Sequence, residues 1–129
     1  MKLSSRKALP RRDELLRERA QASLLRSAFP HVGQLRIELT FSDTRALAHS
    51  PQVHTLYPAA PAFFRFACPC ADCDGDFDLT ACVKSLLNGT STRQRAVSGQ
   101  VACAGTRFRG PQDTACSVQL AYRVLSSPG

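Results

Sequence analysis

The sequence predicts an α+β fold: a small antiparallel sheet of about four strands, one helix packed on it, and a basic helix at the N-terminus. Two patterns indicate this. Apolar and polar residues alternate within 35–42 and 116–124, as they do in half-buried strands. Within 11–29 and 79–87, apolar residues instead recur every three or four positions, as on one face of a helix. With 129 residues, the chain is long enough for one domain with a core of its own.

The N-terminal part of the chain carries most of the positive charge. Residues 1–10 are polar, basic and unpatterned, which predicts a flexible tail, and Pro30 is expected to end the helix over 11–29. Residues 1–30 hold eight basic and three acidic residues, against nine and seven in the rest of the chain. We therefore divide the chain into a basic tail and helix, 1–30, and a single α+β domain, 31–129.

Four strands are expected in the second part. The first spans 35–42, and four of its apolar residues share one face: Leu35, Ile37, Leu39 and Phe41. The second spans 63–68, the third ends at Cys103, and the fourth begins at Cys116. Residues 43–62 hold three prolines and show no sustained period, so they are expected to form a long surface loop.

The cysteines are spaced as in a metal site. Five of the six fall into a close group of three and a later pair: Cys68, Cys70 and Cys73, then Cys103 and Cys116. If the third and fourth strands pair antiparallel, the later pair comes to one end of the sheet, where the second strand delivers the first group. Four thiolates supplied as two pairs are the ligands of structural zinc. The sequence therefore predicts one structural Zn²⁺ per chain, with Cys82 left as a small core residue.

The segment Cys70-Ala-Asp-Cys73-Asp-Gly75 resembles the zinc knuckle of zinc-ribbon and treble-clef proteins, over residues 68–116 only. The resemblance implies that backbone amides point at the sulfur atoms and that Gly75 takes a turn conformation that a Cβ would resist. The third thiol leaves two ligand sets open, because either Cys68 or Cys70 can join Cys73, Cys103 and Cys116. Disulfides and scattered thiols are the alternatives to a metal.

No catalytic constellation is found. The aspartates at 72, 74, 76 and 78 do not form an EF-hand, because Phe77 and Val83 stand where that loop needs Gly and Glu. Pro69-Cys70-Ala-Asp-Cys73 matches half of the zinc deaminase signature, but the H-x-E half is missing. No βαβ unit supports a thioredoxin-like site. We therefore predict a protein that is not an enzyme.

An anionic partner is suggested by the segment between the later two cysteines. Arg107, Phe108 and Arg109 follow a glycine there, and Arg93 and Arg95 precede the same hairpin. With a formal net charge of +7, we expect contact with nucleic acid or with a nucleoprotein assembly such as the ribosome or RNA polymerase. A protein–protein adaptor and a thiol-based redox or metal-responsive switch are the alternatives.

The sequence also suggests where the protein works. Residues 1–30 lack the unbroken apolar run of a secretory signal, and no segment has the length and apolarity of a membrane span. We expect a cytoplasmic protein with no membrane partner. Cytoplasmic thiols are kept reduced, which favours metal binding over disulfides.

Overall fold

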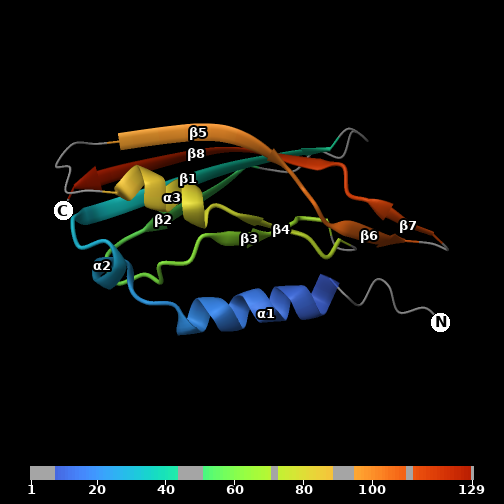
Figure 1. The fold of residues 1–129 in the computed structure, drawn as a ribbon, viewed down its shortest axis with the longest axis horizontal. Helices are drawn as coiled ribbons and strands as arrows, with labels where there is room; N and C mark the ends of the chain where they lie inside the picture. Colours follow the sequence, from blue (N-terminus) through green and yellow to red (C-terminus); the bar gives the residue numbers. More distant parts are fainter. Residues whose placement is uncertain (1–7, 44–50, 71–72, 89–94, 110–111, 129) are drawn as a thin grey trace.

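The structure is a computed structural model that describes residues 8–43, 51–70, 73–88, 95–109 and 112–128. Two helices come first, and a third helix lies between two runs of strands; Figure 1 labels them. They are α1 (Ala8–Gln21), α2 (Leu25–Ala28), β1 (Val32–Asp43), β2 (Gln52–Leu56), β3 (Arg65–Ala67), β4 (Asp76–Asp78), α3 (Thr80–Leu87), β5 (Arg95–Ala102), β6 (Thr106–Arg109), β7 (Gln112–Ala115) and β8 (Val118–Pro128).

The main sheet has four antiparallel strands in the order β2-β1-β8-β5, and two small hairpins, β3-β4 and β6-β7, stand apart from it. Strand β1 pairs with β8 over most of its length, from Val32 opposite Pro128 to Asp43 opposite Val118. The predicted α+β class and the four-stranded antiparallel sheet are confirmed. The predicted inward face of β1 is confirmed as well, since all four of its apolar residues are buried: Leu35, Ile37, Leu39 and Phe41.

Two expectations about strands were wrong. The segment 43–62, expected to be a loop, contains β2, which pairs with β1 through contacts such as Ile37 opposite His54. Strand β2 has only five residues and lies between Pro51 and Pro58, so its alternation of apolar and polar residues is too short to be recognised in the sequence. The strand expected at 63–68 is only three residues long and pairs with β4 in its own hairpin instead of joining the main sheet.

The N-terminal helix is divided. Instead of one helix over 11–29, α1 ends at Gln21 and the short helix α2 begins at Leu25. The break is held by hydrogen bonds to a distant segment: the N–H of Leu25 donates to the carbonyl of Ala60 at 2.7 Å, and that of Ala62 donates to Ser23 at 2.7 Å. Tertiary contacts thus override the helical pattern, and Leu25 becomes a fully buried core residue.

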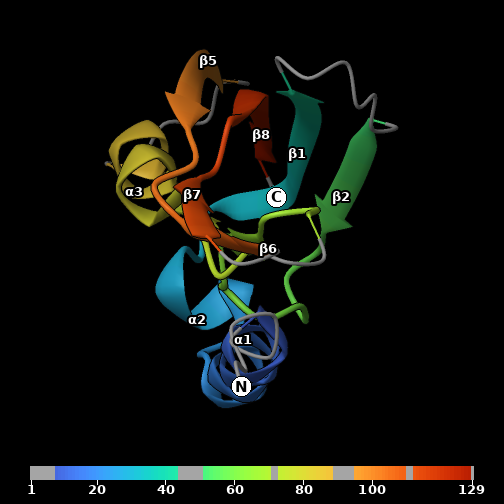
Figure 2. The ribbon, with the colours of Figure 1, turned by 90° about the vertical axis from the view of Figure 1, so that its right-hand side faces the viewer.

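The elements form layers, which two views at right angles show. The main sheet lies at the top of Figures 1 and 2, α1 lies at the bottom, and the β3-β4 hairpin lies between them. Helix α3 packs beneath β5 and places Val83 in the core, and the ring of Phe77 from β4 lies 5.6 Å from that of Phe41. Of the helices that the structure describes, none has the length and apolarity needed to cross a membrane.

Helix α1 lies against the β3-β4 hairpin and is joined to it by an ion pair. Leu15 is 6% exposed, whereas its neighbour Leu16 is 63% exposed, so one side of the helix faces the protein. Arg65 of β3 pairs with Glu18 of α1 and, at 3.1 Å, with Asp76 of β4. The guanidinium of Arg12 donates to the backbone carbonyls of Cys68 and Cys70. The candidate site lies at these cysteines.

Candidate metal centre

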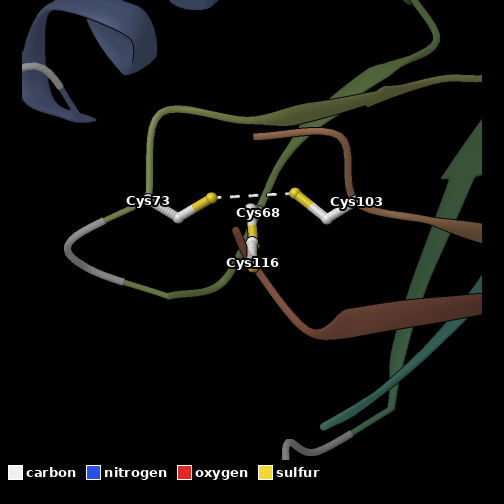
Figure 3. A group of neighbouring side chains, drawn as sticks. All are labelled: Cys68, Cys73, Cys103 and Cys116. Atoms are coloured by element: carbon white, nitrogen blue, oxygen red, sulfur yellow. Dashed lines mark hydrogen bonds between the residues drawn. The ribbon is translucent and has the colours of Figure 1, made fainter. Parts of the chain in front are cut away.

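Four cysteines from distant parts of the chain meet at one end of the main sheet. Their sulfur atoms all lie within 4.8 Å of one another, and all four residues are buried: Cys68, Cys73, Cys103 and Cys116. Cys68 follows β3, Cys73 precedes β4, Cys103 follows β5, and Cys116 separates β7 from β8. Figure 3 shows the four side chains converging on one small volume.

The distances between the sulfur atoms are those of a metal site. The Sγ atoms of Cys68 and Cys116 are 3.7 Å apart, and those of Cys73 and Cys103 are 3.6 Å apart. A tetrahedral ion with metal–sulfur bonds of about 2.3 Å separates its ligands by about 3.8 Å, whereas sulfur atoms in a disulfide are about 2.05 Å apart. All six cysteines lie among the described residues, and no disulfide joins any of them. The group could therefore hold one metal ion.

Backbone amides support the sulfur atoms. The N–H of Gly75 donates to Sγ of Cys73 at 3.3 Å, and the N–H of Gly105 donates to Sγ of Cys103 at 3.3 Å. Backbone hydrogen bonds from Cys70 and Val118 likewise act to lower the pKa values of Cys68 and Cys116. In each case the donor lies two residues after the cysteine. Such N–H groups stabilise a thiolate, which is the form that binds a metal.

Two glycines let the two halves of the site approach each other. A Cβ on Gly105 would lie 2.5 Å from the Cα of Gly75, and a Cβ on Gly75 would lie 2.5 Å from Sγ of Cys103. Neither glycine has a φ in the left-handed region. The expectation that Gly75 is needed for its turn conformation is therefore wrong, and close packing of backbones explains the glycine instead.

Hydrogen bonds also join the two halves directly. The N–H of Asp74 donates to the carbonyl of Thr106 at 3.2 Å, and the N–H of Thr106 donates to Oδ1 of Asp74 at 2.8 Å. Within the second half, the N–H of Cys116 donates to the carbonyl of Gly105 at 3.1 Å. The cysteines are thus held by a network of backbone bonds as well as by packing, so the site has little freedom to spread.

The thiols alter one another's pKa values. A hydrogen bond from Cys68 lowers the pKa of Cys103 to about 6, whereas burial raises the pKa of Cys73 to about 12. The hydrogen bond to Cys103, followed by burial, raises the pKa of Cys68, and burial raises the pKa of Cys116. One thiolate can be stabilised by its protonated neighbours, but four thiolates this close repel one another. A divalent cation supplies the countercharge that all four would need.

The other two cysteines lie outside this group of four. Cys70 is buried, and its carbonyl accepts a hydrogen bond from Nη2 of Arg12 at 2.7 Å. Cys82 is half-buried on α3, where burial, followed by the nearby Cys82, raises the pKa of Tyr122. Of the two ligand sets that the sequence left open, the structure brings together the one that contains Cys68. The triplets Cys73-Asp-Gly75 and Cys103-Ala-Gly105 share a C-x-G pattern, which is a sequence signal for two of the four cysteines but does not choose between Cys68 and Cys70.

Among the described residues, the candidate nucleic-acid-binding residues lie in two places and do not form one group. Nη1 of Arg95 donates to the carbonyls of Leu86 and Asn88, at 2.9 and 3.2 Å, near the end of α3. Three of the others are consecutive residues of β6, whose hairpin begins just after Gly105: Arg107, Phe108 and Arg109. Arg93 lies outside the described residues. Arg95 therefore has a structural role at a helix terminus, where cations are favoured.

The close contact of the two glycines generates a prediction. We expect Gly105→Ala to weaken metal binding at least tenfold and to lower the free energy of unfolding by about 1–3 kcal/mol, because the added methyl group must displace the backbone of Gly75. Competition with a chromophoric chelator and denaturant unfolding would measure the two effects. Ala104→Ser is the matched control, since Ala104 is exposed. Wild-type metal affinity in the Gly105 variant would contradict the role given to this contact.

The four cysteines and their surroundings indicate what the site can do. No protein-family model, curated protein or solved structure matches it. The donor set is four cysteine sulfur atoms, their separations suit a single tetrahedral ion, and backbone N–H groups support them. The site is a candidate metal centre, and its ligands would be four thiolates.

Proposed function

We propose that this protein is a small zinc-binding accessory protein that is not an enzyme. The carrying observation is the group of four cysteine sulfur atoms within 4.8 Å of one another. An all-sulfur tetrahedral set favours zinc, with iron as the other common occupant. Four protein ligands leave no open position for a substrate or an activated water, so the role of the ion is structural. In this respect the centre is zinc-ribbon-like.

The ion would stabilise the fold by joining the two hairpins. The β3-β4 hairpin carries Cys68 and Cys73, and the loop that contains β6 and β7 is bounded by Cys103 and Cys116. Neither hairpin belongs to the main sheet, and each has only a few backbone pairs of its own. A bound ion supplies the strong cross-link that such short hairpins lack.

The ligand set gives a direct test. We expect native mass spectrometry to show one zinc ion per chain in protein prepared without chelators, to show loss of the metal in Cys68→Ser, and to show that Cys70→Ser keeps it. The two variants form a matched pair, because both cysteines are buried and only Cys68 belongs to the group of four. Wild-type protein without stoichiometric metal would refute the proposal. Iron in place of zinc would refute the choice of metal. Loss of metal only from the Cys70 variant would refute the ligand set.

The proposed partner is nucleic acid or a nucleoprotein assembly such as the ribosome or RNA polymerase. Two features support this. The formal net charge is +7, and Arg107, Phe108 and Arg109 lie in a hairpin whose two ends are fixed by the metal centre. Arginines around an aromatic residue suit phosphates and stacked bases, and an ion that anchors both ends of the hairpin would lower the cost of ordering it on binding.

This partner proposal has its own experiment. We expect the double variant Arg107→Ala, Arg109→Ala to bind a single-stranded RNA oligonucleotide more weakly at low salt, with the slope of log affinity against log salt reduced by about 1.4, as two lost phosphate contacts predict. Fluorescence anisotropy would measure both. The control changes two exposed arginines of the main sheet, Arg36→Ala and Arg123→Ala. The proposal fails if wild-type protein does not bind, or if both double variants weaken binding equally.

A protein–protein adaptor is the competing function. Affinity purification with and without nuclease distinguishes the two, because nuclease releases a partner that is bridged by nucleic acid and leaves a directly bound protein in place. Retention of the partner after nuclease would favour the adaptor. The thiol-based switch makes a third prediction, which is release of the metal by a mild oxidant through the surplus thiol, Cys70.

A further inference from the structure

A groove runs between α1 and the strands β2 and β3, on the side of the molecule away from β5. Its volume is about 370 Å³, near the lower end of the range of roughly 300–1,000 Å³ that is usual for small-molecule sites. We call it the α1 groove. Its lining residues come from α1, β2 and the segment around β3: Arg12, Leu15, Leu16, Arg19, Gln52, His54, Leu56, Pro61, Phe63, Arg65, Phe66 and Ala67.

The charged residues that line the α1 groove all have the same sign. Three are arginines, and none of the lining residues is acidic. Arg65 is neutralised by Glu18 and Asp76. Arg12 instead donates to the uncharged carbonyls of Cys68 and Cys70. The helix places Arg12 and Arg19 seven residues apart, hence on the same face two turns away from each other.

His54 responds to this positive charge. Its ring lies within the groove lining, and Nε2 is 3.2 Å from Oε1 of Gln52. Burial, followed by the charge of Arg19, lowers the pKa of His54 below its ordinary value. At neutral pH the ring is therefore uncharged, and it adds a polar group to the groove without adding to the repulsion between cations.

The remaining lining is apolar and partly aromatic. Leu16 lines the groove and is exposed to water, so a bound apolar group could cover it. The ring of Phe66 lies 5.0 Å from that of His54, tilted by 41°. Leu56 and Phe66 also pack against the core, so this side of the groove is held in place by the domain itself. An apolar wall beside two arginines suits a ligand that has an apolar body and a single anionic group.

We propose that the α1 groove binds a small aromatic carboxylate. The carboxylate pairs with the guanidinium of Arg19, and the aromatic body lies against Leu16 and Phe66. A guanidinium presents a planar fork that matches a carboxylate, and the absence of acidic lining residues means that nothing in the groove repels the anion. This site is separate from the group of four cysteines and does not depend on the nucleic-acid proposal.

The experiment uses zinc-loaded full-length protein and 2-naphthoate as the probe. We expect saturable one-to-one binding, seen as shifts of backbone amide NMR signals that cluster at residues lining the groove. Naphthalene-2-methanol has the same ring system without the charge, and it should bind at least five times more weakly. In Arg19→Gln we expect the dissociation constant to rise roughly five- to tenfold, as for a partly exposed ion pair with good fork geometry.

Arg17→Gln is the matched control, because Arg17 is exposed on the same helix and does not line the groove. It should leave the affinity for 2-naphthoate unchanged. Leu16→Ser tests the apolar wall separately. Because Leu16 is exposed, we expect this variant to keep its fold, and the amide spectrum checks this directly. The proposal is overturned by equal affinity for the two probes, by equal weakening in the Arg17 and Arg19 variants, or by signals that shift away from the groove.

Discussion

Four sulfur atoms confined within 4.8 Å of one another are the constraint on which the rest of this structure depends. They come from residues up to 48 positions apart, and they lie where the two small hairpins meet the end of the main sheet. Charged thiolates at such separations repel, and neutral thiols form only weak hydrogen bonds. A bound metal ion would turn this arrangement into a strong cross-link between distant parts of the chain. Folding and metal binding would then be one process.

The backbone around the site suits a bound ion. Gly75 and Gly105 pack against each other, and each donates its N–H to the sulfur of the cysteine two residues earlier. Asp74 and Thr106 then join the two halves by reciprocal hydrogen bonds. A scattered set of core cysteines would need none of these features. Together they explain why small residues stand beside the cysteines and why the cysteine side chains converge.

The N-terminal arm is part of the same arrangement. Arg12 donates to the carbonyls of Cys68 and Cys70, so α1 contacts the backbone that carries the candidate ligands. Glu18 adds an ion pair to Arg65. Part of the positive charge that the sequence suggested for an anionic partner is thus used inside the protein. The α1 groove lies beside this attachment, and both the buried Leu15 and the exposed Leu16 line it.

Much of the architecture could be predicted from the sequence, because period-two alternation in β1 and β8 directly reflects burial of one sheet face. The meeting of Cys103 and Cys116 followed from the antiparallel pairing of β5 and β8, whereas the first group comes from a separate hairpin and not, as expected, from a strand of the main sheet. The choice of Cys68 over Cys70 did not follow from the sequence, because local spacing allows both, and only the folded backbone decides which sulfur reaches the others. Strand β2 and the break between α1 and α2 depend on long-range hydrogen bonds such as that from Leu25 to Ala60, which no local pattern records.

X-ray absorption at the zinc edge tests the central claim most directly, because it reports the atoms that surround the ion in the folded protein. The account predicts a single shell of four sulfur scatterers at about 2.3 Å, without nitrogen or oxygen neighbours. A shell containing nitrogen or oxygen, or fewer than four sulfur atoms, would contradict it, since the ion would then be held by something other than Cys68, Cys73, Cys103 and Cys116.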